Sequence, residues 1–208
     1  MAKGNRGGRA GTAGGVNPAN IKNVQNLISQ RERKQAEVDQ TLTVLRDMQN
    51  QYGVNVDTFT ADIVGKDAST LAFCDGDGNI TVNTSYFNTK AMDSAMKESA
   101  KDGFHPSIGN KSCIESVVAH EFGHTLTHKV GEKMGGLTMD QASTRIVNEA
   151  RKITGDKGVV IMANKISKYA SYSNAEAIAE AVCDCYCNGS KAKAQSKAIK
   201  SVLDKYLK

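Results

Sequence analysis

The segment VVAHEFGHTLTH, residues 117–128, places His120 and His124 four positions apart, with Glu121 directly after the first histidine. Positions i and i+4 of a helix lie on one face, so both imidazoles can bind one zinc ion at about 2.0–2.1 Å. Glu121 is rotated by about 100° and does not ligate. We expect it to take a proton from an attacking water molecule. The alternative, a surface helix with histidines on it, is disfavoured by the apolar residues around the motif.

A catalytic zinc site takes three protein ligands and leaves one position open. The pattern HExxHxxGxxH would supply a third histidine, but Val130 stands at that position. His128 lies two helical turns from His120, which is too far for a shared ion. His105, next to Pro106 in a predicted loop, is expected to be structural, with substrate contact as the alternative. The third ligand should therefore be a carboxylate from a later helix.

Residues 167–184, SKYASYSNAEAIAEAVCD, contain the best candidates for this carboxylate. Ser173 or Asn174 is expected to cap a helix on which Glu176 and Glu180 share one face. Two carboxylates among alanines are costly to bury unless a metal or a base pairs with them. We therefore expect Glu176 to ligate. The alternative is that its side chain only completes a capping box with the N-cap serine.

The HEFGH motif followed by KYxxxSNxEAxAEA resembles the zinc-dependent metallopeptidases of the anthrax lethal factor type. It is also similar to a metallopeptidase-like domain in minor head proteins of phages of Gram-positive bacteria, where a G-x-H-P segment precedes the helix, as GFHP does at 103–106. The resemblance covers roughly residues 70–187. It implies a zincin-like fold, a bound zinc ion and peptide-bond hydrolysis. The chain departs from the family at Val182, where an aromatic residue is usual.

The resemblance also implies roles for individual residues. Glu176 becomes the third zinc ligand, which completes a gluzincin set of two histidines and a glutamate. Tyr169, seven residues earlier, donates its hydroxyl to the oxyanion, with Tyr172 as the competing tyrosine. Glu180 orients a ligand histidine from the second layer around the metal.

Helix, strands and then further helices follow one another along the chain, which predicts an α+β class. We expect a disordered Gly/Arg tail over 1–16 and a long N-terminal helix over 17–53. The zincin-like metallopeptidase domain should cover 54–190, followed by a basic C-terminal helix over 191–208.

Alternating residues and a turn-rich DGDG predict a small sheet within 54–83, with a hairpin around 75–78. The resemblance implies that TLAFCDG or NITVN forms the sheet edge beside the cleft, to which a substrate peptide adds as a strand. A capping box indicates that the HEFGH helix runs from about 113 to 129, before a glycine. Further helices are predicted over about 88–101, 138–153, 158–168, 174–187 and 191–206.

The composition limits the cellular locations and the binding partners that we expect for the protein. The net charge is +5, much of it at the two ends, which permits weak nucleic-acid contact. No apolar run has the length of a membrane span, and no segment reads as a secretory signal. Five cysteines predict a reduced, cytoplasmic protein, in the host cytoplasm or on a virion if phage-encoded. The group Cys183, Cys185 and Cys187 lacks the spacing of a zinc knuckle and is expected to be small buried thiols.

Other functional classes stay open at this point. One is a virion structural protein, bound to head or portal components, that retains the fold without proteolysis. A second is a nucleic-acid-binding protein that uses the basic ends. A third is a toxin-type protease acting on one host protein.

Overall fold

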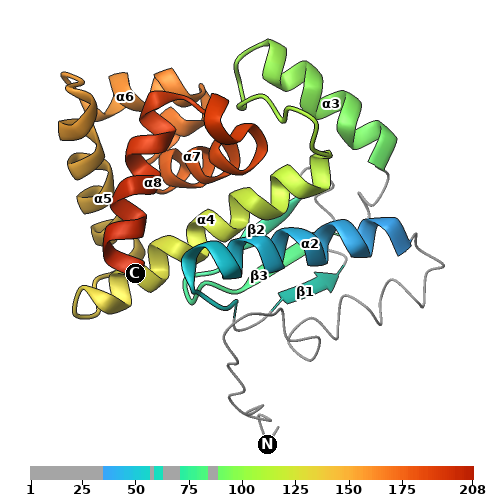
Figure 1. The fold of residues 1–208 in the computed structure, drawn as a ribbon, viewed down its shortest axis with the longest axis horizontal. Coiled ribbons are helices and arrows are strands. Elements are labelled where there is room, and N and C mark those ends of the chain that lie inside the picture. The colour runs from blue at the N-terminus through green and yellow to red at the C-terminus, as the bar shows by residue number, and fades with distance from the viewer. Residues whose placement is uncertain (1–34, 57–58, 63–70, 84–88) are drawn as a thin grey trace, which may run out of the picture.

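A computed structural model describes residues 35–56, 59–62, 71–83 and 89–208 (Figure 1). The predicted disordered tail over 1–16 and the first part of the predicted helix over 17–53 lie outside the described residues. Helices predominate and accompany a small sheet, so the predicted α+β class is confirmed. The elements in chain order are α2 (Gln35–Tyr52), β1 (Phe59–Asp62), β2 (Ala72–Cys74), β3 (Ile80–Asn83), α3 (Thr89–Lys101), α4 (Cys113–Lys133), α5 (Met139–Thr154), α6 (Val159–Ile166), the 3-10 helix η3 (Tyr169–Tyr172), α7 (Asn174–Asn188), η4 (Gly189–Lys191) and α8 (Ala194–Leu207).

The sheet places β3 between the other two strands, parallel to β1 and antiparallel to β2. The predicted hairpin joins β2 to β3. Its turn is closed by the Asp75 carboxylate, which accepts the backbone N–H groups of Asp77 and Asn79, both at 2.9 Å. Among the described strands β2 is thus an edge. The prediction of an edge in TLAFCDG therefore agrees with the structure, whereas NITVN is the central strand and that alternative is wrong.

α4 is the central helix of the fold (Figure 1). α2 and the sheet lie along one side of it, and α5 to α8 along the other. The predicted capping box begins it: Ser112 Oγ accepts the N–H of Glu115, and the Glu115 carboxylate accepts the N–H of Ser112. Buried Val118, Phe122 and Leu126 pack into the main core. Contacts on both sides fix α4, and with it the HEFGH motif, as a rigid element.

The end of α4 differs from the prediction. The helix continues to Lys133 and runs through Gly131, instead of ending near residue 129. A Cβ on Gly131 would lie 2.5 Å from the carbonyl oxygen of Leu137. The Gly131 carbonyl accepts the N–H groups of Gly136 and Leu137 at 3.1 and 3.0 Å. This glycine therefore allows the following turn to pack closely and does not stop the helix. α3, α5, α6, α7 and α8 agree with the predictions to within three residues at each end, and α2 ends one residue before the predicted end at 53. The 3-10 helices η3 and η4 were not predicted.

α8 corresponds to the predicted basic helix and packs against α5 and α7, with Leu203 fully buried. Its lysines meet acidic partners: Lys200 lies 2.6 Å from Asp204, and Lys205 lies 2.8 Å from Glu149. Part of the positive charge is thus neutralised within the fold. Within the described ranges, no helix combines the length and apolar character needed to cross a membrane.

All five cysteines are free thiols. Cys183 is buried, as predicted for the cysteine-rich end of α7. Cys185 and Cys187 were also predicted to be buried, but they are only half-buried, so the prediction is wrong for these two. On a helix only part of the circumference faces the core, and these two positions lie on its margin.

Candidate metal centre

α4 and α7 touch at Gly123, and this glycine sets their separation. A Cβ there would lie 2.6 Å from the Cα of Ala179 and 3.3 Å from the Cβ of Val182. The two helices therefore approach more closely than any larger residue permits. Val182, where the resemblance leads one to expect an aromatic residue, lies against this contact. The approach brings the face of α7 that carries Glu176 and Glu180 against the histidines of α4.

The first turn of α7 directs Glu176 towards α4. Ser173, and not Asn174, is the N-cap: its hydroxyl accepts the N–H of Glu176 at 3.1 Å. The Glu176 side chain itself turns to the histidines. Its Oε2 lies 3.1 Å from His120 Nε2, and its Oε1 lies 3.7 Å from His124 Nε2. The alternative in which this side chain only completes a capping box is therefore wrong.

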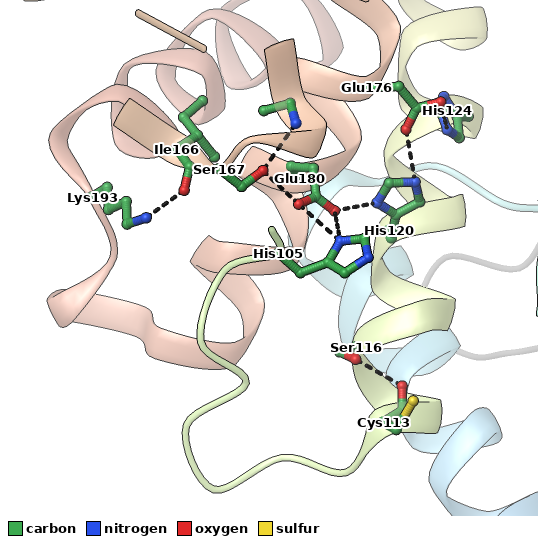
Figure 2. A network of polar contacts seen from close by, with 11 residues as sticks. His105, Cys113, Ser116, His120, His124, Ile166, Ser167, Glu176, Glu180 and Lys193 are labelled. Atoms are coloured by element: carbon green, nitrogen blue, oxygen red, sulfur yellow. Dashed lines mark hydrogen bonds and ion pairs between the residues drawn. The ribbon is translucent and has the colours of Figure 1, made fainter. Parts of the chain in front are cut away.

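The three predicted ligands come together. Nitrogen atoms of His120 and His124 and a carboxylate oxygen of Glu176 all lie within 4.8 Å of one another. Ligands of a tetrahedral zinc ion, each at ~2.0–2.1 Å, are ~3.4 Å apart. The contacts from Glu176 Oε2 to His120 at 3.1 Å and from Glu176 Oε1 to His124 at 3.7 Å lie on either side of this separation, each from a different carboxylate oxygen. Figure 2 shows the three side chains converging from the two helices, in an arrangement that could hold a metal ion.

The electrostatics favour a cation at this position. Glu176 Oε2 is buried and forms an ion pair with His120 Nε2 at 3.1 Å. A buried carboxylate oxygen needs a positive partner of this kind, and a metal ion could supply the same compensation. Burial lowers the pKa of His120, but Glu176 and Glu180 outweigh burial and raise it well above its ordinary value. Burial, reinforced by His120, lowers the pKa of His124 to about 4, so this imidazole is neutral, the form that ligates.

The carboxylate of Glu180 contacts the opposite ring nitrogen of His120 from the one that faces Glu176 (Figure 2). It is buried and accepts hydrogen bonds from His120 Nδ1 at 2.9 Å, His105 Nδ1 at 3.2 Å and Ser167 Oγ at 2.7 Å. Burial raises the pKa of Glu180, but the hydrogen bonds from His105 and His120 lower it to about 2. The ionised carboxylate holds the proton of His120 on Nδ1. Its Nε2 is left to face Glu176.

Glu121 borders the site without joining the ligand group. Its side chain is 7% exposed. Burial raises its pKa to about 7; the charge of His120 and the backbone N–H of Cys74 oppose this shift, and the charge of Glu176 adds to it. A carboxyl group that titrates near neutral pH can both accept a proton and return it.

Tyr169, which belongs to η3, lies against the rings of His105 and His120. Its ring stacks on His120 with centroids 5.9 Å apart and meets His105 edge-on at 5.1 Å. Burial and then the charge of Glu176 raise its pKa to about 12, so its hydroxyl keeps the proton at neutral pH. Tyr172 is 67% exposed, and only Tyr169 of the two lines the cavity described next.

A cavity of about 350 Å³ opens beside His120, Glu121 and Tyr169. These residues, with His105 and Glu180, form its polar side. Concave sites with a few polar groups on apolar walls are where ligands commonly bind. The rest of the lining is mainly apolar and includes Leu71, Ala72, Met96, Pro106, Ile108 and Val117.

Sequence reasoning left His105 with two alternatives and gave Ser167 no role. His105 was expected to be structural, with substrate contact as the alternative; it lines the cavity and is bonded to Glu180. The GFHP segment was the available signal for it, whereas no pattern pointed to Ser167. His128 stays apart from the ligand group, as predicted, and its Nε2 lies 3.3 Å from Glu132 of the same helix.

Comparisons with known proteins add no relative to this geometry. No protein-family model matches the chain, and no curated protein or solved structure matches it. The functional conclusion therefore depends on the residues and their arrangement.

Proposed function

We propose that the chain is a zinc-dependent metallopeptidase with a zincin-like fold, encoded by a phage or prophage, that hydrolyses peptide bonds. The observation that carries the proposal is the convergence of His120, His124 and Glu176, of which His120 lines a cavity together with Glu121 and Tyr169. A purely structural metal site is closed and needs no acid–base group or hydroxyl donor next to it. The presence of Glu121 and Tyr169 therefore favours a catalytic site over a metal site that only stabilises the fold.

Held by His120, His124 and Glu176, a zinc ion supplies Lewis acidity that polarises a carbonyl group and acidifies a water molecule. Residues of the chain orient the ligand histidine and transfer the proton. Glu180 keeps the Nδ1 proton of His120 in place, so that Nε2 is the ligand atom. Glu121, with a pKa of about 7, takes the proton of the attacking water and returns it to the leaving amine.

Tyr169 serves the oxygen that gains charge during the attack. With a pKa of about 12 its hydroxyl remains a donor at neutral pH. The stacking on His120 fixes the ring on the cavity side. A donor already in position when charge develops lowers the barrier without reorganisation, typically by a few kcal/mol.

The substrate peptide is proposed to bind along β2. The Leu71 carbonyl accepts the N–H of Asn83 in β3 at 2.8 Å, and the N–H of Asp75 bonds to the carbonyl of Asn79, just before β3, at 3.0 Å. Hydrogen bonding alternates in an antiparallel pair, so Ala72 and Cys74 turn their N–H and C=O groups to the open side. Ala72 lines the cavity together with Glu121. A peptide added to this edge would pass the reacting groups.

The first test is zinc content. We expect elemental analysis to find one zinc ion per chain in the purified wild type and much less in His124→Ala and Glu176→Ala. His128→Ala is the matched control and should keep its zinc, because this histidine lies outside the ligand group. A folded wild type that takes up no zinc, even when zinc is supplied, would rule out the proposed hydrolase.

The second test is hydrolysis of a mixed peptide library, read by mass spectrometry. Glu121→Gln should retain zinc and lose cleavage, because an amide cannot take the proton of the water. Tyr169→Phe should retain zinc and cleave about 100-fold more slowly, since one oxyanion donor is missing. A wild type that binds zinc and cleaves nothing would favour the virion structural protein. Stable co-purification with head or portal proteins would then test that alternative.

A further inference from the structure

His105 is held in place from two directions. Its loop, between α3 and α4, is pinned to the segment that leads into α7: the N–H of Lys168 bonds to the Gly103 carbonyl at 2.9 Å, and the N–H of Tyr169 bonds to the Phe104 carbonyl at 3.0 Å. These bonds set the His105 ring beside Tyr169, with centroids 5.1 Å apart. The ring therefore has a fixed place on the cavity wall.

Glu180 determines how the imidazole is turned. His105 Nδ1 lies 3.2 Å from both carboxylate oxygens. An ionised carboxylate can only accept, so Nδ1 carries a proton. Within the part of the chain that the structure describes, every hydrogen bond of His105 passes through Nδ1, and the second ring nitrogen points away from Glu180 (Figure 2). The side chain is 24% exposed and lines the cavity.

The surroundings of this nitrogen suggest its use. The cavity combines its polar side, to which His105 belongs, with apolar lining residues such as Leu71, Met96 and Ile108. A few polar groups among apolar walls give a ligand defined hydrogen bonds and so fix its orientation. We propose that Nε2 of His105 hydrogen-bonds a backbone amide of the peptide substrate, at the residue whose apolar side chain enters the cavity. The inference rests on the proposed peptidase function and assigns His105 to substrate binding, next to Tyr169 at the reacting oxygen.

Two substitutions separate this role from simple support of Glu180. In His105→Asn the short amide keeps a donor near the position of Nδ1 and removes the group at Nε2. In His105→Gln the longer amide places a polar group near Nε2 and withdraws from Glu180. His128→Asn is the matched control, because this histidine does not line the cavity.

Two hydroxamates serve as probes for calorimetry on the zinc-loaded protein. Acetohydroxamate reaches only the metal, whereas a leucine-containing dipeptide hydroxamate also extends into the cavity. We expect His105→Asn to weaken the dipeptide probe about tenfold, the scale of one hydrogen bond to a ligand, and to leave acetohydroxamate and the zinc content unchanged. His105→Gln should keep most of the affinity for the dipeptide probe. On any peptide that the wild type cleaves, His105→Asn should raise KM about tenfold with little change in kcat.

The opposite pattern would overturn the inference. A loss confined to His105→Gln would show that His105 acts only through Glu180. Equal weakening of both probes in His105→Asn would show that His105 affects the metal centre and not a contact made by the dipeptide. Unchanged binding of the dipeptide probe in His105→Asn would show that Nε2 does not touch the ligand. A wild type without zinc, or one that binds neither probe, would instead remove the proposed function and this inference together.

Discussion

Two parts of α4, residues 113–125 and residues 126–133, here called its two halves, carry the same residue types in different surroundings. His120 and His124 face the carboxylate of Glu176 on α7. His128, one turn further, lies against the β2–β3 turn. It pairs with Glu132 of the same helix, and the Glu132 side chain is 53% exposed. All three histidines are spaced four apart, so spacing alone does not make a site. The element packed opposite decides which histidines can share an ion.

Each half of α4 also contains a glycine at a close contact. At Gly123 a Cβ would lie 2.6 Å from the Cα of Ala179 on α7, and at Gly131 it would lie 2.5 Å from the Leu137 carbonyl oxygen. The first contact sets the distance between the histidines and the carboxylates. The second sets only the turn that leads to α5. The halves should therefore respond alike in stability and differently in metal binding.

Zinc-dependent stability gives the largest expected difference between the halves. Zinc at 1,000 times its Kd stabilises a protein that binds it by about 4 kcal/mol. We expect His124→Ala to lose this zinc-dependent rise in Tm and His128→Ala to keep it. Thermal unfolding with added zinc and with a chelator measures the shift. A loss of the zinc effect in His128→Ala would mean that the C-terminal half of α4 also contributes to the site.

The two glycines provide the next comparison. Gly123→Ala and Gly131→Ala should each lower the free energy of unfolding by about 2–3 kcal/mol, because the clashing atoms belong to the backbone and cannot rotate away. Only Gly123→Ala should also weaken zinc, since it pushes α7 from α4. Urea unfolding in chelator and a zinc titration test both parts. Zinc affinity that is equally reduced in Gly131→Ala would show that the site senses the whole helix.

Much of the fold could be predicted because its signals are local. The capping box of Ser112 and Glu115 and the periodic apolar residues of α4 specify the helix without reference to other elements. Gly131 was misjudged because its role depends on Leu137, which reaches it only in the folded chain. The central place of β3 likewise depends on its pairing with β1, a contact that no short-range pattern encodes.

The candidate site shows the same division. His120, Glu121 and His124 are neighbours in sequence, and helical geometry alone puts the two histidines on one face. The shared role of Glu180 could not be read in this way. It accepts from His105 and Ser167, which lie on separate loops that meet only after folding.

The acidic partners of the histidines give a smaller effect. Glu180→Gln removes the charge that holds the Nδ1 proton of His120, to which Glu180 bonds at 2.9 Å, while keeping nearly the same shape. We expect zinc affinity to fall about 10- to 100-fold, the usual consequence of removing a carboxylate behind a ligand histidine. Competition with a coloured zinc chelator measures it. Unchanged affinity would mean that the ring of His120 is positioned by packing alone.

The smallest effect is expected for Glu132, the acidic partner of His128 in the C-terminal half of α4. Glu132→Gln removes the partner of His128 at 3.3 Å, on a side chain that is 53% exposed. Solvent screens such pairs, so the free energy of unfolding should change by less than about 0.5 kcal/mol, and less still at high salt. Zinc affinity should stay at the wild-type value in the same chelator assay. A tenfold loss would show that charge at the end of α4 reaches the metal centre, and the division of this helix into two independent halves would be wrong.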